Sequence, residues 1–326
     1  MRAVVLEARN SPLTVVDDYP DPGANGNEVI DVIACGLCHS DLHVVAGEFP
    51  SPLPIVLGHE VTGKHPELGP VMVYAPWGCG RCRECTDGYE MICADATEAG
   101  LVVDGGYAEH MGIADRAYLY PLGDLDPVAS APLACGGLTG YRAVQQTLET
   151  LRRPGRKRRV LVIGAGGIGQ FALRYLKLLT DAEVYAFDRA PDKRATAVAI
   201  GAEGAFDADD DLPLFDAVVD FVALDATLAL AAGAVARRGL VVAVGLYGGR
   251  IPFGVGAVPH EARFMSSIWG TRPQLGELLD LARREPSIIA PVETMPFTDA
   301  QLAHDRLRAG DVQGRLVLLI NQTHAN

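Results

Sequence analysis

Four cysteines within one short segment have the spacing of a metal site. Cys79, Cys82, Cys85 and Cys93 lie too close together in the sequence to form a framework of disulfides. Four thiolates match the tetrahedral all-sulfur coordination of a structural zinc ion, which leaves no position for a substrate. An iron–sulfur cluster is the main alternative, but the common ferredoxin run ends in a shorter gap followed by proline, whereas Ala94 follows here. We therefore predict a structural zinc ion in this segment.

A second set of metal-ligand residue types lies earlier in the chain, in Cys38-His39-Ser40-Asp41-Leu42-His43 and in Gly58-His59-Glu60. A thiolate, an imidazole and a carboxylate within reach of one another can hold a catalytic zinc ion that keeps one exchangeable position. From the spacing alone, a buried core with satisfied hydrogen bonds explains these residues equally well. Both interpretations stay open at this point.

A glycine-rich turn near the middle of the chain has the residues of a dinucleotide-binding site. Gly164, Gly166 and Gly169 form G-x-G-x-x-G between an expected strand and an expected helix. These glycines permit a tight turn, close approach of the backbone to a pyrophosphate and close packing of the helix on the sheet. Asp188 follows at the distance typical of the residue that accepts hydrogen bonds from the ribose hydroxyls. We therefore predict that this region binds a dinucleotide.

The end of the second expected strand bears on the choice of cofactor. The carboxylate of Asp188 repels a 2′-phosphate and so favours NAD over NADP. Arg189 beside it can accommodate that phosphate. The sequence predicts NAD and leaves open whether Arg189 permits NADP.

Two regions of different pattern must position these residues. From residue 1 to about 134, short apolar runs broken by glycine and proline predict a β-rich region. From about residue 137, apolar runs alternate with helical stretches, the pattern of a parallel sheet. The expected strands of this second region are 160–163, 183–187, 217–222 and 240–244, and its expected helices are 170–179 and 226–236. The tail adds expected helices at 273–284 and near 299–308, and an expected strand at 316–320.

Length and charge exclude several other classes of protein. A chain of 326 residues exceeds what one hydrophobic core usually organises, so two domains are expected. The net charge of −13 repels phosphate backbones and anionic headgroups, so neither nucleic acid nor a membrane is an expected partner. The apolar stretch 227–236 is too short to span a bilayer, and residues 1–7 hold no export signal. We therefore expect a cytoplasmic protein.

A basic run just before the first parallel strand needs its own interpretation. Arg152, Arg153 and the cations at 156–159 surround Pro154-Gly155. A solvated loop is the preferred interpretation, because a nucleic-acid patch needs neighbours of the same sign. A nucleic-acid binder that used this run would be retained on DNA in a salt-sensitive way, which we do not expect.

The order of all these motifs resembles that of the zinc-dependent medium-chain alcohol dehydrogenases of the bacterial NAD-dependent type. In that family the Cys-His-Ser-Asp-Leu-His and Gly-His-Glu motifs precede the four-cysteine lobe, and a dinucleotide fold follows. The likeness extends to Ala131-Pro-Leu-Ala-Cys135-Gly-Gly-Leu-Thr139 and to Gly314-Arg315, so it covers essentially the whole chain. It implies an α/β protein in which a β-rich GroES-like catalytic domain accompanies a Rossmann domain with a doubly wound parallel sheet. The implied boundaries are 1–136 and 269–326 for the catalytic domain, with the structural zinc lobe near 79–93, and 137–268 for the Rossmann domain.

The resemblance also implies roles for individual residues. The implied ligands of the catalytic zinc are Cys38, His59 and Cys135, with Glu60 as an occasional ligand or a neighbour of the ligands. The alcohol proton is implied to pass through Ser40, the cofactor ribose and His43. The residues implied to contact NAD are His39, Thr139, Gly164, Gly166, Gly167, Ile168, Gly169, Asp188, Arg189, Lys193 and Arg315. Of these, His39 and Arg315 would contact the pyrophosphate, Lys193 the adenosine ribose, and Thr139 the nicotinamide.

The implied activity is reversible NAD-dependent oxidation of primary or secondary alcohols to aldehydes or ketones. The active site would lie in the cleft between the domains, and the assembly would be a homodimer or a homotetramer. A polyol dehydrogenase on the same scaffold is the alternative within the enzymes. The chain is shorter than the family pattern at 63–71 and 206–216, so a zinc- and nucleotide-binding protein without turnover is the alternative outside them.

Several aromatic, histidine and cysteine residues have no role in these motifs. Candidates either for an apolar substrate pocket or for the core are Phe49, Trp77 and Trp269. Residues interpreted as structural or surface groups are Cys35, His110, His260 and His304.

Overall fold

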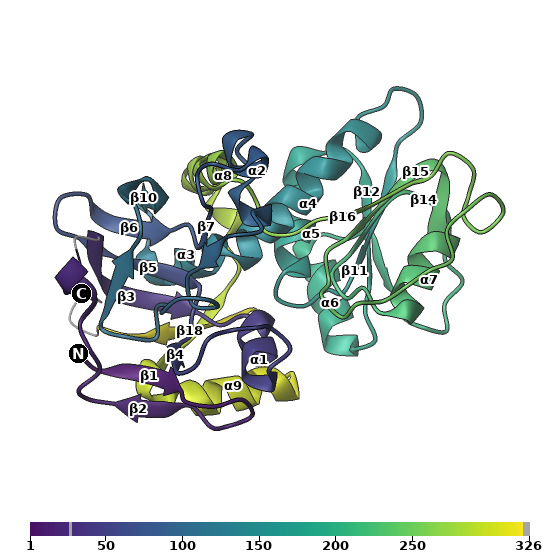
Figure 1. Cartoon of the computed structure of the whole chain (residues 1–326). Coiled ribbons are helices and arrows are strands. Elements are labelled where there is room, and N and C mark those ends of the chain that lie inside the picture. The colour runs from purple at the N-terminus through teal and green to yellow at the C-terminus, as the bar shows by residue number, and fades with distance from the viewer. Residues whose placement is uncertain (26–27, 322–326) are drawn as a thin grey trace. The chain divides into compact units, whose positions relative to one another are not determined.

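A computed structural model describes residues 1–25 and 28–321, and the chain divides into two compact units (Figure 1). The first unit comprises Met1–Leu138 and the chain from Gly270 onward. The second unit comprises Thr139–Trp269. After Trp269 the chain returns to the first unit, and its C-terminal segment adds strands to the main sheet of that unit.

The first unit is rich in short strands. Its strands are β1 (Ala3–Leu6), β2 (Thr14–Val16), β3 (Glu28–Gly36), β4 (Ile55–Val56), β5 (Glu60–His65), β6 (Gly69–Val73), β7 (Pro76–Trp77), β8 (Thr97–Glu98), β9 (His110–Ile113), β10 (Leu119–Pro121), β17 (Val292–Pro296) and β18 (Arg315–Leu319). The main sheet has the order β10-β6-β5-β3-β18-β17, and β9 also pairs with β3. Smaller sheets have the orders β2-β1-β4 and β7-β8. All pairings in the main sheet are antiparallel except that of β17 with β18.

Short helices fill the connections of this unit. Its helices are α1 (His39–Ala46), α2 (Arg83–Thr86), α3 (Pro127–Ser130), α8 (Arg272–Arg284) and α9 (Ala300–Ala309), with 3₁₀ turns η1 (Pro22–Asn25), η2 (Glu90–Ile92), η3 (Arg116–Tyr118), η4 (Ala131–Ala134), η5 (Pro286–Ile288) and η6 (Phe297–Asp299). The central strand β3 has a buried apolar second half, and it leads through Leu37 directly into Cys38 and α1. Strand β5 begins at Glu60, immediately after His59. The strands in the middle of the main sheet therefore deliver both metal-ligand segments.

The first of the two shortened segments forms a tight hairpin. Strands β5 and β6 pair with Thr62 opposite Met72 and His65 opposite Gly69, so residues 66–68 alone close the turn. Gly69 adopts a φ of 71°, in the left-handed region that favours glycine. On its other side β5 pairs with β3, with a register shift between Val32 and Ala34 and with Gly36 opposite Glu60. The short loop therefore leaves the pairing of the Gly-His-Glu strand intact.

The second unit is a parallel sheet with helices. Its strands are β11 (Arg159–Ile163), β12 (Glu183–Phe187), β13 (Gly204–Phe206), β14 (Phe215–Asp220), β15 (Val235–Ala243) and β16 (Arg263–Ser266), and its helices are α5 (Gly169–Leu179), α6 (Pro191–Ile200) and α7 (Asp225–Ala234). Helix α4 (Gly136–Leu151) leads into this unit. The strand order β13-β12-β11-β14-β15-β16 is the 3-2-1-4-5-6 order of the doubly wound dinucleotide fold. All of these strands run parallel, but the order in which the chain adds them to the sheet reverses between β11 and β14, which is where ligands of such folds bind.

The structure shifts one expected boundary in this unit. The helix expected at 226–236 ends at Ala234, because Val235 already pairs with Phe215 as the first residue of β15. Val235 is fully buried, so its burial in the sheet outweighs the helical alanine run before it. The second shortened segment, residues 207–214, connects β13 to β14 without a helix.

Within residues 1–25 and 28–321, every helix is too short or too polar to cross a bilayer.

Candidate active site

Three buried metal-ligand side chains come together in the first unit. The ligand atoms of Cys38, His59 and Cys135 all lie within 4.8 Å of one another. Cys38 is the N-cap of α1, His59 precedes β5, and Cys135 follows η4, so three separate segments supply them. Four tetrahedral ligands on one zinc ion lie about 3.3–3.8 Å apart, which this cluster can reach with little movement. Two sulfurs and an imidazole are soft and borderline donors that suit zinc, and three protein ligands leave a fourth position open.

A buried carboxylate fixes the geometry of two of these ligands. Asp41 Oδ1 lies 3.1 Å from Nδ1 of His59, and both side chains are fully buried. Asp41 Oδ2 accepts a hydrogen bond of 2.9 Å from the backbone N–H of Cys38. A carboxylate on Nδ1 orients the imidazole and leaves Nε2 to bind a metal ion. Asp41 therefore contacts both the His59 ring and the backbone of Cys38, and it fixes the positions of these two ligands relative to each other.

A buried ion pair lies beside the three ligands. Nη2 of Arg315 lies 2.5 Å from Oε1 of Glu60 and donates a hydrogen bond of 2.8 Å to the carbonyl oxygen of Leu37. Glu60 Oε1 also accepts the backbone N–H of Gly136 at 2.9 Å. Burial raises the pKa of Glu60 to about 7 although Arg315 opposes the shift. The pair thus joins the segments that carry Cys38, His59 and Cys135.

The charges of the site shift the pKa values of the ligands. The hydrogen bond with Cys135 lowers the pKa of the Cys38 thiol well below its ordinary value, against the effect of burial, and the charges of His59 and Arg315 act in the same direction. The same hydrogen bond, together with burial, raises the pKa of Cys135. Burial disfavours the charged form of His59, but Asp41 and Cys38 outweigh it and raise the pKa of His59. The site therefore favours one thiolate, and ligation of a metal by both sulfurs releases a proton.

Two residues of the expected proton path lie on the first turns of α1. Ser40 Oγ lies 3.6 Å from Cys38 Sγ, and Ser40 is half-buried. His43 is three residues later, on the same face of the helix, and its Nδ1 contacts Glu48 Oε2. The Glu48 side chain is 60% exposed, so the His43 end of this path reaches water. The sequence analysis did not identify Glu48, because this residue follows the end of α1 and lies outside the Cys-His-Ser-Asp-Leu-His motif.

The four-cysteine segment closes on itself. The sulfurs of Cys79, Cys82, Cys85 and Cys93 lie within 4.8 Å of one another, and the sulfurs of Cys82 and Cys93 are 3.7 Å apart. The backbone N–H groups of Cys79 and Cys85 donate to the sulfurs of Cys93 and Cys82. Backbone hydrogen bonds from residues 81 and 82 lower the pKa of the Cys79 thiol to about 6, which favours the thiolate that zinc requires. Burial and the neighbouring thiols raise the pKa of Cys85, and they raise that of Cys82 although a backbone hydrogen bond from Cys85 opposes the shift. The arrangement of four sulfurs around one point fits a closed zinc site.

The second unit holds the glycine-rich turn between β11 and α5. Gly164 has a φ of 84°, and a Cβ on Gly169 would lie 1.9 Å from the carbonyl oxygen of Gly164, so neither position accepts another residue. Gly167 and Ile168 complete the turn. Helix α5 has no side-chain cap and no acidic residue in its first turn, which leaves its N-terminus available to a phosphate.

The carboxylate at the end of β12 lies against this turn. Asp188 accepts backbone hydrogen bonds of 2.9 Å from Ala165 and from Ala190. Lys193 Nζ lies 4.0 Å from the position of a Cβ on Gly166, so this cation faces the turn. Arg189 is exposed. Asp188 and Lys193 thus bring a carboxylate and a cation to the glycine-rich turn, the region where a dinucleotide fold holds the ribose.

The remaining expected residues divide between the two units. His39 is exposed at the first position of α1, and Thr139 is buried in the first turn of α4. Arg315 is buried on Glu60, and its contact with a pyrophosphate stays a prediction. Trp77 is buried and donates its indole N–H to the Tyr74 carbonyl, which is a core arrangement.

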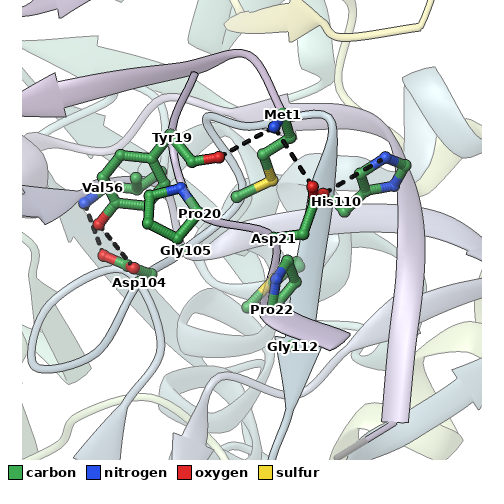
Figure 2. A pocket seen from close by; sticks show the side chains of 11 residues that line it. Met1, Tyr19, Pro20, Asp21, Pro22, Val56, Asp104, Gly105, His110 and Gly112 are labelled. Carbon is green, nitrogen blue, oxygen red and sulfur yellow. Dashed lines mark hydrogen bonds and ion pairs between the residues drawn. The ribbon is translucent and has the colours of Figure 1, made fainter. Parts of the chain in front are cut away.

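A surface pocket of about 250 Å³ lies elsewhere in the first unit (Figure 2). Its lining includes the Met1 ammonium, which donates to the Tyr19 carbonyl at 2.9 Å and lies 3.4 Å from the Asp21 carboxylate. Asp104 accepts hydrogen bonds from the Tyr19 hydroxyl and the Val56 backbone N–H. These polar groups satisfy one another across the pocket, so we assign it no part in the chemistry.

Two family descriptions match the chain. "Alcohol dehydrogenase GroES-like domain" matches residues 24–124, and "Zinc-binding dehydrogenase" matches residues 167–284. An NAD-dependent alcohol dehydrogenase of Sulfolobus acidocaldarius is 31% identical over 351 aligned positions, which cover 98% of this chain and 100% of that protein. An NAD-dependent alcohol dehydrogenase of Saccharolobus solfataricus is 32% identical with the same coverage of both chains.

Solved structures give the same result. The alcohol dehydrogenase of Aeropyrum pernix superposes with a TM-score of 0.88 at 31% identity, over 98% of this chain and 100% of that chain. The acetophenone reductase of Geotrichum candidum, solved in complex with NAD, has a TM-score of 0.84 at 30% identity, over 98% of this chain and 97% of that chain. The similarity therefore extends over both units.

Proposed function

Because this chain belongs to the zinc-dependent medium-chain alcohol dehydrogenase family, we propose that it catalyses the reversible NAD-dependent oxidation of alcohols to aldehydes or ketones. The observation that carries the proposal is the buried Cys38, His59 and Cys135 cluster in a chain that also has the glycine-rich turn of a dinucleotide fold. Either feature alone would permit a binding protein. Their combination supplies the two groups that alcohol oxidation needs.

The cofactors have separate tasks. Zinc held by Cys38, His59 and Cys135 would act as a Lewis acid that favours the alkoxide form of the alcohol. NAD held at the turn between β11 and α5 would accept the hydride. The second zinc, held by the four-cysteine segment, would stabilise the fold.

The side chains around the ligands control charge and protons. Asp41 orients His59. The positive charge of Arg315 balances the carboxylate of Glu60 beside the ligands. Ser40 is the hydroxyl nearest to the cluster on α1 and would take up the proton of the alcohol. His43 and the exposed Glu48 would pass that proton to water.

Cofactor choice is expected to depend on Asp188. Asp188→Ser removes a charged acceptor of the ribose hydroxyls and the repulsion of a 2′-phosphate, while Arg189 remains available to that phosphate. Hydrogen bonds to charged groups contribute about 1.5–3 kcal/mol, so kcat/KM with NAD should fall by about 10–100-fold. The ratio of kcat/KM for NADP to that for NAD should rise, as measured by steady-state kinetics with both cofactors.

The matched control removes the neighbouring cation. Arg189→Ala alone should leave kcat/KM with NAD within a few-fold of the wild type, and in the double variant it should cancel the gain toward NADP. A wild-type preference for NADP, or an unchanged preference in Asp188→Ser, would show that the end of β12 was misinterpreted.

The substrate class is tested by the rate of NADH formation on a panel of alcohols. We propose simple primary or secondary alcohols as the substrates. Phe49, whose ring centroid lies 5.4 Å from that of His43, is the apolar candidate that lies beside the proton path. Faster turnover of polyols than of simple alcohols would instead assign a polyol dehydrogenase, and no turnover of either would leave a binding protein.

We also propose that the chain assembles as a homodimer or homotetramer in the cytoplasm. Strand β16 lies at an edge of the parallel sheet, and the segment before it exposes Phe253 by 71% and Val255 by 99%. An open edge beside exposed apolar side chains favours association with a second copy. None of the cysteines, all of which lie in the described part of the chain, forms a disulfide, as expected in a reducing compartment. A mass equal to one chain in light scattering, or recovery of the protein outside the cytoplasm, would contradict these proposals.

A further inference from the structure

A chain of close polar contacts extends from the metal ligand His59 to a histidine near the C-terminus. Asp41, which holds His59, also accepts a hydrogen bond of 3.1 Å from the Tyr107 hydroxyl. The same hydroxyl lies 3.3 Å from Nε2 of His304 on α9. All four side chains are buried, and His304 is 1% exposed. No motif in the sequence connects Tyr107 or His304 with the site.

The direction of each hydrogen bond follows from the donors available. A tyrosine hydroxyl has one proton, and Tyr107 gives it to Asp41, so its oxygen must accept the proton on Nε2 of His304. Nδ1 of His304 is buried and has no hydrogen-bond partner among the described residues, so a proton there would be costly. Burial lowers the pKa of His304, which agrees with a neutral ring protonated at Nε2. Every donor in the chain therefore points toward the Asp41 carboxylate.

This polarity has a consequence for the metal ligand. An Asp41 carboxylate that accepts from Tyr107 and from the backbone of Cys38 is held as an acceptor toward His59 as well. When a metal binds and displaces the proton of Nε2, His59 keeps its remaining proton on Nδ1, toward Asp41. Hydrogen bonds in series strengthen one another at low dielectric constant, so the more distant members act on the same carboxylate.

Packing ties the chain to the segment that carries His59. The backbone N–H groups of Gly106 and Tyr107 donate to the carbonyl oxygens of Gly58 and Leu57. A Cβ on Gly58 would lie 2.5 Å from the Tyr107 ring, so this ring sits against the peptide before His59. The His304 ring meets the Tyr107 ring edge-on with centroids 5.9 Å apart. Helix α9 thus packs, through His304, against the tyrosine that contacts the His59 segment.

We propose that Tyr107 and His304 are positioning residues that act through Asp41 to hold His59 in its metal-binding orientation. The inference rests on the proposed function, since it assigns their role with respect to the proposed catalytic zinc. Neither residue is itself one of the three ligands. The expected effect of their loss is therefore weaker retention of the catalytic zinc, with the ligands themselves unchanged.

The test measures how fast zinc passes from the purified, zinc-loaded protein to a coloured chelator. Tyr107→Phe removes the hydroxyl and keeps the ring, so release from the catalytic site should be about 10-fold faster, the low end of the range for a direct hydrogen-bonding partner of a metal ligand, because Tyr107 acts through Asp41. Release from the four-cysteine site in the same sample should be unchanged. Cys38→Ser, which lacks the catalytic ligand, identifies the phase that belongs to the catalytic site.

His304 offers a matched pair of variants. His304→Leu removes the donor, and we expect release about 3–10-fold faster, less than the range for a direct partner because one more bond intervenes. His304→Gln keeps an N–H near the position of Nε2 and should release zinc at close to the wild-type rate. His304 lines a surface hollow of about 330 Å³ with Ser11, Gln301 and Arg308, so either side chain has room.

The outcomes separate this inference from the proposed function. Wild-type rates in both Tyr107→Phe and His304→Leu would overturn the positioning role, as would equal acceleration at both zinc sites together with a lower melting temperature. A His304→Gln variant that behaves like His304→Leu would overturn the donor role of His304. Wild-type protein that binds no zinc through Cys38, His59 and Cys135 would overturn the proposed function, and this inference with it.

Discussion

Replacing Cys38 with serine is expected to abolish alcohol oxidation and to leave the fold intact. The thiolate of Cys38 is one of three ligands, and its loss removes the Lewis acid, which supplies several kcal/mol of transition-state stabilisation. Since each 1.36 kcal/mol is tenfold in rate, kcat/KM should fall by about 10³-fold or more. Serine is a favoured N-cap, so α1 should still begin at His39. NADH formation, zinc per chain and the melting temperature together measure this.

Two other cysteines serve as controls for this variant. Cys35→Ser makes the same exchange at a buried cysteine outside the cluster, and it should keep both zinc ions and activity within a few-fold. Cys82→Ser breaks the four-cysteine site and should lower the melting temperature, because a ligand at 1,000 times its Kd stabilises a fold by about 4 kcal/mol. If Cys38→Ser and Cys82→Ser had the same effects on folding and turnover, the division into a catalytic and a structural site would be wrong.

The second large effect is expected at Ser40. Ser40→Ala removes the hydroxyl that takes up the alcohol proton and leaves Cys38, His59 and Cys135 in place. General acid–base assistance is worth about 10²–10⁴-fold, so the rate of alcohol oxidation should fall by that range. Zinc content should stay at the wild-type value. The measurement is kcat for alcohol oxidation with zinc and NAD binding determined on the same preparation.

His43 provides the comparison for Ser40. His43 lies at the water end of the path beside the exposed Glu48, where water can partly replace it, so His43→Ala should reduce the rate less than Ser40→Ala does. Near wild-type oxidation by Ser40→Ala, with zinc and NAD bound, would falsify the path and move the proton elsewhere.

Sequence reasoning works best for residues in a closely spaced motif. The four-cysteine segment and the glycine-rich turn are such cases, because the ligand spacing or the backbone approach is set within about fifteen residues. The parallel strands were also predictable, since continuous apolar runs such as β11 and β12 occur where both faces of a sheet are buried. Val235 was not, because its place in β15 depends on pairing with Phe215, which lies twenty positions earlier.

The distant partners in the catalytic site could not be predicted in the same way. Cys135 was reached only through resemblance to a family, since nothing local joins it to Cys38. Asp41 does carry a local signal, because an acidic residue three positions after an N-cap completes a capping box. Its second role, holding His59, depends on the long-range approach of β5. The roles of Tyr107 and His304 depend on long-range contacts, because Tyr107 and helix α9 come close to Asp41 only in the folded chain. No spacing in the sequence predicts these contacts.

The shortened loops raised the question of turnover, and the structure bears on one of them. The hairpin between β5 and β6 keeps the pairing of Glu60 with Gly36 and the contacts of Glu60 with Arg315 and Gly136. The deletion therefore lies beyond the hydrogen bonds that support the ligands. This favours an active enzyme over a protein that only binds zinc and nucleotide.

The most direct test of the account is a zinc titration of the metal-depleted protein, with the rate of NADH formation from NAD and simple alcohols recorded at each step. We expect two zinc ions per chain, and activity that rises in proportion to the filling of the site formed by Cys38, His59 and Cys135. Both zinc sites filled and NAD bound, with no NADH formed from any alcohol, would contradict it.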